Sequence, residues 1–183
     1  MQLVPVAVKM MSPKLVHKTE AGAVALGIED GHTLSRALDQ MAKAVSTHDA
    51  DAVADSFLIE AMSPPPLAEM IVTLRSDPQF GAALVLGSGG ILTELVGDAV
   101  TILLPARPAE IAQALNSLRV ARLLKGFRGR PTADMDKVAS ALHRLCNAFL
   151  QERETIAEIE INPMFVYADH VVAVDALVQV AQS

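Results

Sequence analysis

The segment Val6-Ala7-Val8-Lys9-Met10-Met11-Ser12-Pro13-Lys14-Leu15-Val16-His17-Lys18-Thr19-Glu20 lies near the start of the chain and combines a short apolar strand, a turn and a His-Lys pair. No acidic residue precedes Glu20, although the whole protein has a formal net charge of -6. Lysine binds phosphate as a point charge, and histidine can carry a phosphoryl group on a ring nitrogen. The segment therefore predicts phosphate chemistry, with Lys9 and His17 as its candidate residues.

Composition narrows the possible functions. The chain has 183 residues, enough for one domain or two small lobes, and 51% of them are hydrophobic, enough for a sizeable core. Tryptophan is absent, aromatic residues make up 3% and the sequence pI is about 5.3, which argues against nucleic-acid recognition by base stacking. Cys146 is the single cysteine, which excludes a disulfide framework or a zinc cluster and fits a cytoplasmic location. No uncharged apolar run reaches transmembrane length, so we expect no membrane partner.

Strands and helices alternate along the chain. Apolar runs bounded by turn residues predict strands, and apolar positions at helical spacing predict helices, one of them capped by Thr33. The run Ser63-Pro64-Pro65-Pro66 stops regular structure and predicts a boundary between a first lobe, 1–63, and a second lobe, 64–183. The expected strands are 4–10, 23–28, 57–62, 69–75, 82–86, 91–95, 100–104, 156–161 and 171–177, and the expected helices are 33–48, 108–118 and 134–154.

Two regions without acidic residues, 1–19 and 111–133, together hold eight of the 15 lysines and arginines. In an acidic protein such regions suggest a small polyanionic ligand, although two solvated surfaces are the alternative. Within the second region, the loop 125–131 alternates glycine with basic residues, among them Arg128. Glycine lets the backbone approach an anion closely, which strengthens the ligand interpretation for this loop.

A flexible glycine-rich loop is expected at Gly87-Ser88-Gly89-Gly90. It could cradle a phosphate in a nest of backbone N–H groups, or it could be an ordinary tight turn. The loop lacks the Gly-Lys-Ser/Thr ending of a P-loop and the spacing of a dinucleotide-binding fingerprint, so it indicates neither of those motifs.

The end of the chain predicts a hairpin with polar residues on one face. If its turn is centred between Ala168 and Asp169, Asn162 lies opposite Asp175, with Cβ atoms about 4.5–5.5 Å apart. Glu160 shares this face because side chains in a strand repeat with a period of two.

Glu160, Asn162 and Asp175 then form an all-oxygen cluster. A few protein oxygens, completed by water and substrate phosphates, suit Mg²⁺. The alternative is the solvated outer face of a hairpin at the edge of a sheet, and Pro163 favours such an edge position.

Taken together, these motifs resemble the ATP-grasp domain of NDP-forming acyl-CoA synthetases, such as ADP-forming acetate–CoA ligase, which are relatives of the succinyl-CoA synthetase β subunit. The resemblance implies an α+β (α/β) ATP-grasp fold of two lobes, each with a mixed or antiparallel sheet flanked by helices, and a first lobe truncated at its N-terminus. The markers are Pro5-Val-Ala-Val-Lys9, Ser12-Pro13, His17-Lys18-Thr19-Glu20, Asp77-Pro78-Gln79-Phe80-Gly81, Gly87-Ser88-Gly89-Gly90, Gly126-Phe127-Arg128-Gly129 and Glu160-Ile161-Asn162-Pro163.

The resemblance also implies an enzyme, an acid–thiol ligase that works with a CoA-binding α-type subunit or domain. The chain would bind ATP or ADP with Mg²⁺ and move a phosphoryl group between the nucleotide and a phosphohistidine while acyl phosphate and acyl-CoA interconvert. His17 matches the histidine that accepts the phosphoryl group and hands it to ADP. The other matched positions are Lys9 at the nucleotide phosphates, Glu60 and Met62 beside the adenine, Asn162 and Asp175 as magnesium ligands, and Arg128, cofactor-binding but without an assigned task.

Some features depart from the family pattern. The usual Gly-Gly-Val after the His-Lys motif is Gly22-Ala23-Val24, and Ala23 could crowd a close backbone approach. The family normally has an upstream helical segment and a strand before Pro5, and apolar surface left uncovered there would favour a homo-oligomer. A non-catalytic regulatory or remnant module, as in ATP-grasp domains fused to acetyltransferases, therefore stays open as the alternative function. The acyl substrate and the choice of ATP or GTP are not specified by these motifs.

Overall fold

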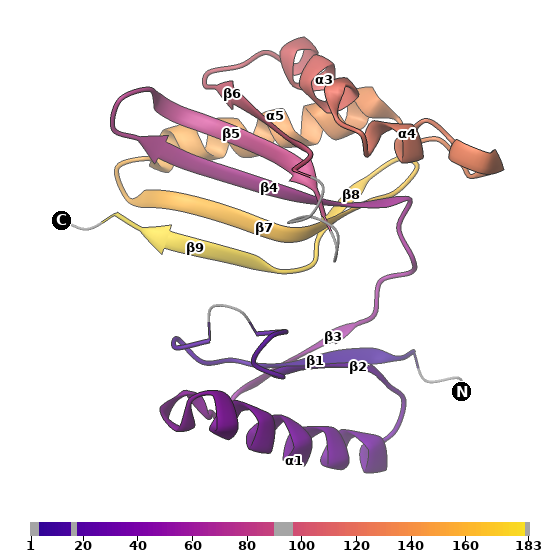
Figure 1. The fold of residues 1–183 in the computed structure, drawn as a ribbon, viewed down its shortest axis with the longest axis vertical. Coiled ribbons are helices and arrows are strands. Elements are labelled where there is room, and N and C mark those ends of the chain that lie inside the picture. Colours follow the sequence, from indigo (N-terminus) through magenta and orange to yellow (C-terminus); the bar gives the residue numbers. More distant parts are fainter. Residues whose placement is uncertain (1–3, 16–17, 90–96, 182–183) are drawn as a thin grey trace. The chain divides into compact units, whose positions relative to one another are not determined.

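Two separate antiparallel sheets, each with its own helical layer, form the computed structural model shown in Figure 1. The structure describes residues 4–15, 18–89 and 97–181. The chain divides into unit 1, Met1–Pro64, and unit 2, Pro65–Ser183. All strand pairs among the described residues are antiparallel, within the range of sheets that the sequence predicts.

Unit 1 is a three-stranded sheet in the order β2-β1-β3 with one long helix, α1, along it (Figure 1). Alternation in β1 sends Val8 and Met10 to the helix, where both are completely buried against α1 residues such as Met41 and Val45. The other face of this sheet therefore carries the intervening residues of β1. The elements are β1 (Val6–Met10), β2 (Val24–Ile28), α1 (Gly31–His48), the 3₁₀ turn η1 (Ala50–Ala52) and β3 (Phe57–Ala61).

Helix α1 starts before the expected cap. Asp30 is the N-cap, and its carboxylate accepts a hydrogen bond of 2.7 Å from the backbone N–H of Thr33. The Thr33 hydroxyl accepts in turn from the Asp30 N–H, so the two residues form a reciprocal capping box. The prediction that Thr33 is the N-cap is wrong, because a threonine at the third helical position takes part in the same motif.

Unit 2 is a six-stranded sheet in the order β6-β5-β4-β7-β8, with β9 also paired to β7. Figure 1 shows α3 and α5 on one side of this sheet, and their apolar residues, including Ile111, Leu142 and Phe149, pack against buried strand residues such as Leu74 and Leu84. The strands are β4 (Ala68–Asp77), β5 (Gly81–Ser88), β6 (Ala99–Leu103), β7 (Ile156–Val166), β8 (Val171–Ala173) and β9 (Ala176–Val180). The helical elements are α3 (Pro108–Ser117), α4 (Ala121–Leu124), the 3₁₀ turn η2 (Phe127–Gly129) and α5 (Met135–Glu152).

The glycine-rich segment differs from the expected flexible loop. Gly87 and Ser88 belong to β5, and the backbone N–H of Gly89 donates a hydrogen bond of 2.8 Å to the carbonyl of Glu69. A Cβ atom at Gly89 would lie 2.8 Å from backbone atoms of Glu69 and Met70. At Gly87 and Gly89 the glycines therefore serve close packing between strands. Gly90 and the expected strand 91–95 lie outside the described residues.

Strand β7 is an inner strand, which corrects the expectation that Pro163 marks an edge. It pairs with β4 on one side and with β8 and β9 on the other. Pro163 is accommodated by a bulge, because its position and that of Asn162 lie between the paired residues Ile161 and Met164, which are opposite Val72 and Met70. A proline lacks the N–H that a regular ladder requires, and a bulge removes that requirement.

Candidate functional site

The face of the unit 1 sheet opposite α1 carries a buried lysine. Lys9 is 6% exposed, and its Nζ lies 2.9 Å from Oε2 of Glu60, whose side chain is 43% exposed. Lys9 is paired with Leu58 and Ala7 with Glu60, so the ion pair runs diagonally between β1 and β3 on one face. The structure thus brings together two of the predicted cofactor-binding residues, and the sheet holds the ammonium group in a fixed place.

Apolar side chains surround this ion pair. Val24 is paired with Lys9 on β2, and Leu26 follows it on the same face by the period of two. Leu26 is 64% exposed, Leu58 41% and Met62 37%. Met62 follows the end of β3, and its sulfur accepts a hydrogen bond of 3.0 Å from the N–H of Gly27. An exposed apolar surface beside one cation and one carboxylate has the chemistry that a nucleotide base and its phosphates require.

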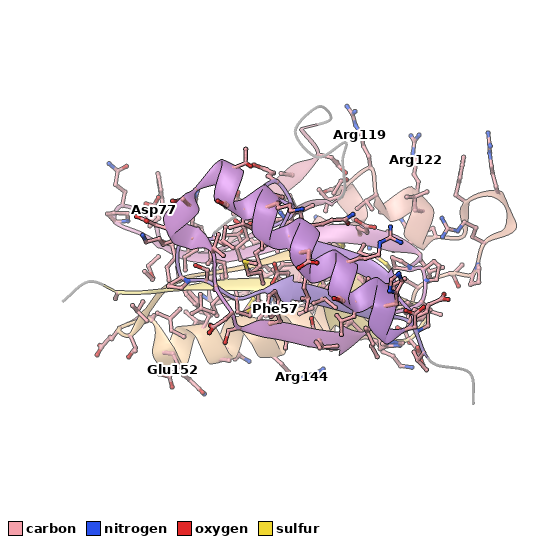
Figure 2. The ribbon with its side chains drawn as sticks, turned by 90° about the horizontal axis from the view of Figure 1, so that it is seen from below. Phe57, Asp77, Arg119, Arg122, Arg144 and Glu152 are labelled. Carbon is pink, nitrogen blue, oxygen red and sulfur yellow. The ribbon has the colours of Figure 1, made fainter. Side chains whose placement is uncertain are left out.

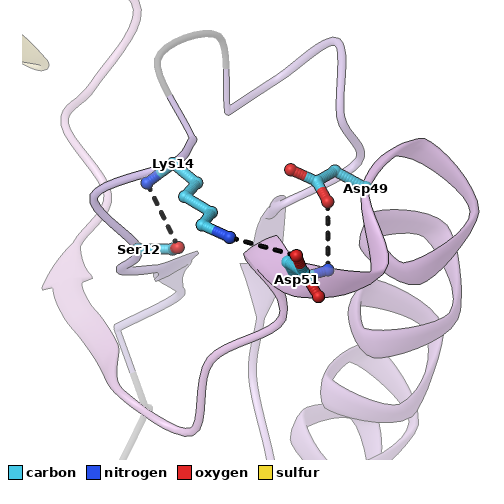
Figure 3. A network of polar contacts seen from close by, with 4 residues as sticks. All are labelled: Ser12, Lys14, Asp49 and Asp51. Atoms are coloured by element: carbon cyan, nitrogen blue, oxygen red, sulfur yellow. Dashed lines mark hydrogen bonds and ion pairs between the residues drawn. The ribbon is translucent and has the colours of Figure 1, made fainter.

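The loop after β1 is fastened by polar contacts, drawn in Figure 3. Lys14 Nζ lies 3.3 Å from a carboxylate oxygen of Asp51 in η1, and the Lys14 N–H donates to the Ser12 hydroxyl at 3.4 Å. The N–H of Asp51 donates to the Asp49 carboxylate at 3.0 Å. Carboxylates from later in the chain therefore pair with both Lys9 and Lys14, which reduces the positive field that the opening segment predicts.

The predicted catalytic residue, His17, lies outside the described residues. The chain beyond it returns to β2 through a turn in which the Ala23 N–H donates to the Lys18 carbonyl at 2.8 Å. A Cβ atom at Gly22 would lie 2.7 Å from the Cβ of Ala44 in α1, whereas Ala23 is completely buried in the unit 1 core. The tight position that the structure shows in this turn is Gly22, and the expected crowding at Ala23 stays a prediction.

In unit 2, the predicted hairpin register is confirmed. Ile161 is paired with Ala176 on β9, and the Asn162 N–H donates a hydrogen bond of 3.1 Å to the Asp175 carbonyl. Asn162 therefore lies opposite Asp175, with the bulge of β7 next to it. Ile161 and Met164 both point into the core, so the intervening Asn162 is exposed on the other face of the sheet.

Glu160 precedes this pair in β7 on the face away from the core, directly opposite Thr73 of β4. Within the described residues, no group of three or more His, Cys, Asp or Glu side chains could hold a metal ion. The oxygen donors of Glu160, Asn162 and Asp175 still fit Mg²⁺, which uses one or two carboxylates and completes its shell with water and phosphate. Their role as magnesium ligands stays a prediction.

Arg128 lies on a different element from these oxygen donors. It is in η2 with a left-handed backbone, φ 54°, and its guanidinium lies 5.2 Å from the centre of the Phe127 ring. None of the ion pairs in the described part of the chain includes Arg128. The structure therefore does not by itself link this residue to the predicted metal site.

The sequence reasoning missed Asp98, which fastens the end of β5. One carboxylate oxygen accepts from the Arg119 N–H at 2.8 Å, and the other accepts from the Val120 N–H at 3.1 Å and from the Ser88 hydroxyl. Burial alone disfavours the charged carboxylate, but the hydrogen bonds from Arg119, Ser88 and Val120 outweigh it and keep the pKa of Asp98 below its usual value. An aspartate in the connection between the expected strands 91–95 and 100–104 was the available sequence signal.

Known proteins resemble this chain over nearly its whole length. A family model described as an ATP-grasp domain matches residues 2–180. The chain is 30% identical over 174 residues to the acetate–CoA ligase (ADP-forming) II subunit beta of Pyrococcus furiosus, covering 94% of this chain and 73% of that protein.

None of the helices in the described ranges is long and apolar enough to cross a membrane.

Two solved structures of the dinucleotide-forming acetyl-coenzyme A synthetase 1 of Candidatus Korarchaeum cryptofilum are also similar. One, in complex with coenzyme A, Ca-AMPCP and HgCl+, has a TM-score of 0.88 and 29% identity, covering 97% of this chain and 76% of that chain. The other contains coenzyme A and Mg-AMPPCP, with its phosphohistidine segment pointing towards the nucleotide binding site. Its TM-score is 0.79 and its identity 27%, covering 98% of this chain and 78% of that chain.

The fold is therefore that of an ATP-grasp domain, as the sequence predicts. Within this class, the chain belongs to the family of the β subunits of ADP-forming acetate–CoA ligases.

Proposed function

We propose that the chain is the nucleotide-binding part of an ADP-forming acyl-CoA ligase and transfers a phosphoryl group between ADP or ATP and a phosphohistidine. Family membership supports the reaction class. The observation that carries the proposal for this chain is the ion pair between the buried Lys9 and the partly exposed Glu60, 2.9 Å apart, among apolar side chains on the sheet face opposite α1. Burying a lysine amine costs desolvation energy even when the amine is paired, so a buried Lys9 supports a functional task for its charge.

All the predicted site residues except Arg128 have a chemical role in this proposal. Lys9 binds the nucleotide phosphates as a cation, and Glu60 orients it while Met62 borders the base. Asn162 and Asp175 are the magnesium ligands, and the bound ion would offset negative charge on the phosphates. His17 accepts the phosphoryl group from a phosphohistidine of the partner, so that one N–P bond breaks as another forms. It then gives the group to a terminal phosphate oxygen of ADP.

The partner in this proposal is a CoA-binding α-type subunit or domain. The name "subunit beta" of the Pyrococcus relative supports a divided enzyme. The Korarchaeum complex, whose phosphohistidine segment points towards its nucleotide binding site, supports transfer through such a segment. The acyl pocket would lie on the partner. A cytoplasmic location stays a prediction, based on the single cysteine, Cys146. This thiol is buried, and burial raises its pKa to about 11.

Calorimetry with Mg-ADP tests nucleotide binding directly. We expect the wild type to bind with a Kd between about 1 μM and 1 mM, the usual range for enzyme substrates. Lys9→Ala should weaken binding about tenfold or more, because a hydrogen bond to a charged group contributes roughly 1.5–3 kcal/mol. Lys14→Ala is the matched control, since its ammonium group lies beside Asp51 and has no role in the proposal.

The same experiment separates binding from transfer. His17→Ala should bind Mg-ADP like the wild type but fail to form ATP from a phosphorylated partner subunit. Equal Kd values for wild type and Lys9→Ala would remove Lys9 from the site. A folded wild type that binds no nucleotide would support the alternative, a non-catalytic module.

A further inference from the structure

Five cationic side chains lie close together along the segment that contains α4 and η2 of unit 2. This basic ridge is defined as Arg119, Arg122, Lys125, Arg128 and Arg130, and all five residues are exposed. No acidic residue occurs between positions 111 and 133, although the protein as a whole has 21 acidic and 15 basic residues. The ridge is thus opposite in charge to the rest of the molecule.

The backbone places the first three cations on one side. Arg119, Arg122 and Lys125 follow one another at intervals of three, and the turn repeats with hydrogen bonds such as Arg122 N–H to the Arg119 carbonyl at 3.1 Å. Val120 and Leu124 point the other way, into the unit 2 core. Figure 2 shows the Arg119 and Arg122 side chains extending outward in the same direction. Like charges on neighbouring turns repel one another, so this row is unfavourable for the isolated fold.

Within residues 4–15, 18–89 and 97–181, no carboxylate forms an ion pair with these cations, and the longer-range attraction of Asp98 acts on Arg119 alone. The nearby Asp98 directs both of its oxygens to the backbone N–H groups of Arg119 and Val120 and to a hydroxyl, and so makes no ion pair with the Arg119 side chain. The positive charge of the basic ridge is therefore available to attract a molecule outside the described residues.

The second half of the ridge is held in a fixed shape. Arg128 has a left-handed backbone that is unfavourable for residues with a Cβ atom, and its guanidinium lies over the exposed ring of Phe127 in a cation–π contact. A Cβ atom at Gly126 would lie 3.0 Å from the Arg130 carbonyl oxygen, so this turn is tight. The Arg130 guanidinium donates a hydrogen bond of 3.0 Å to the Pro66 carbonyl, which ties the loop to the segment before β4.

We infer that the basic ridge is a docking surface for an acidic segment of the partner protein. The inference rests on the proposed function, in which the chain works with a second subunit, as the name of the Pyrococcus relative supports. Electrostatic complementarity speeds association and fixes the orientation of two proteins. A row of exposed cations on the outside of a helix and turn fits several carboxylates along a chain better than one enclosed small anion.

Nucleic acid is the other polyanion that such a row could bind. The composition disfavours it, because a net charge of -6 repels a phosphate backbone and the chain has 3% aromatic residues for base stacking. The experiment below includes nucleic acid as an outcome against the inference.

Binding of the CoA-binding subunit from the same genome is measured by biolayer interferometry at 50 and 300 mM NaCl. Arg122→Glu/Lys125→Glu reverses two ridge charges, and Arg36→Glu/Lys43→Glu makes the same change on the exposed side of α1 as the matched control. We expect the ridge variant to weaken binding about tenfold or more at 50 mM NaCl, mainly through slower association, and the control to differ less than about threefold. Higher salt should narrow the difference between the variants, because it screens exposed charges.

Three results would overturn the inference. One is equal weakening by the ridge and control variants. Another is a wild type that binds Mg-ADP but forms no complex with the CoA-binding subunit, which would leave the proposed nucleotide site intact. The third is salt-dependent binding of a double-stranded DNA oligonucleotide that the ridge variant alone abolishes. Calorimetry of Mg-ADP on the ridge variant keeps the tests apart, because its nucleotide Kd should equal that of the wild type.

Discussion

At the scale of single residues, Asp98 shows how one carboxylate can hold three segments. It accepts hydrogen bonds from Ser88 at the end of β5 and from the backbone of Arg119 and Val120 before α4, and its own carbonyl accepts from the Ser88 N–H at 3.0 Å. Hydrogen bonds to an ionised group are stronger than neutral ones. The carboxylate therefore fixes the strand end and the start of the basic ridge relative to each other.

Asp98→Asn should destabilise unit 2 by about 2 kcal/mol, because the amide keeps the shape but loses the charge that its donors require. The pKa of Asp98 is lower in the folded protein than its ordinary value of 3.8, so its contribution is present above about pH 4 and is lost as pH falls through the lowered pKa. Urea unfolding of wild type and variant from pH 3 to pH 7 measures this.

Asp39→Asn, which changes an exposed carboxylate on α1, is the matched control. The difference in the free energy of unfolding between wild type and Asp98→Asn should be constant from about pH 5 to pH 7 and should shrink towards pH 3. If this difference in the free energy of unfolding grew as the pH fell, the charged Asp98 carboxylate would not be the stabilising group.

The sequence could not predict which side chains form ion pairs with the lysines of the opening segment. Lys9 was predicted from its place at the end of an apolar strand, but its pairing with Glu60 depends on the register between β1 and β3, which β2 and α1 separate along the chain. Lys14 and Asp51 pair across a similar separation. Charge counted along the sequence therefore overestimates the positive field, because long-range contacts decide which cations stay unpaired.

At the scale of elements, the sequence predicted the C-terminal hairpin but not the bulge inside it. A symmetric turn fixes which residues face each other, so Asn162 and Asp175 could be paired from spacing alone. The bulge depends on the other neighbour, β4, whose residues Met70 and Val72 pair with Met164 and Ile161. The inner position of β7 could not be predicted for the same reason, since strand order is a property of the whole sheet.

The glycine-rich element provides a test of packing. Gly89→Ala places a methyl group 2.8 Å from the backbone of Glu69 and Met70, and neither backbone can turn away as a side chain could. We expect a loss of about 1–3 kcal/mol in the free energy of unfolding, typical of overpacking. Gly31→Ala is the control, because nothing lies within 4 Å of its added Cβ atom and alanine favours a helix. Urea unfolding followed by circular dichroism compares the two, and an equal stability change in both variants would disprove the packing role.

At the scale of the whole molecule, the described residues form two hydrophobic cores that share no residue. The residues of one core lie in the predicted first lobe, and those of the other lie in the predicted second lobe. One comprises buried residues of α1 and its sheet, such as Val8, Met41 and Val45. The other comprises buried residues of β4, β5, α3 and α5, such as Leu84, Leu142 and Phe149. Small domains bury a smaller fraction of their surface and are correspondingly less stable, so the 64 residues of unit 1 should be the less stable part.

Because the two cores share no residue, a cavity made in one unit should speed hydrogen exchange in that unit only. Met41→Ala should cost about 2–5 kcal/mol in unit 1, because Met41 is 2% exposed and a truncated core side chain leaves a void. Hydrogen exchange followed by mass spectrometry should then show faster exchange in β1, β2 and α1 but unchanged protection in β4 and α5. Leu142→Ala, 1% exposed in the unit 2 core, should give the reverse pattern. If Met41→Ala accelerated exchange in α5 as strongly as in α1, the two cores would unfold as one, and nucleotide binding would have to be analysed as a property of a single cooperative domain.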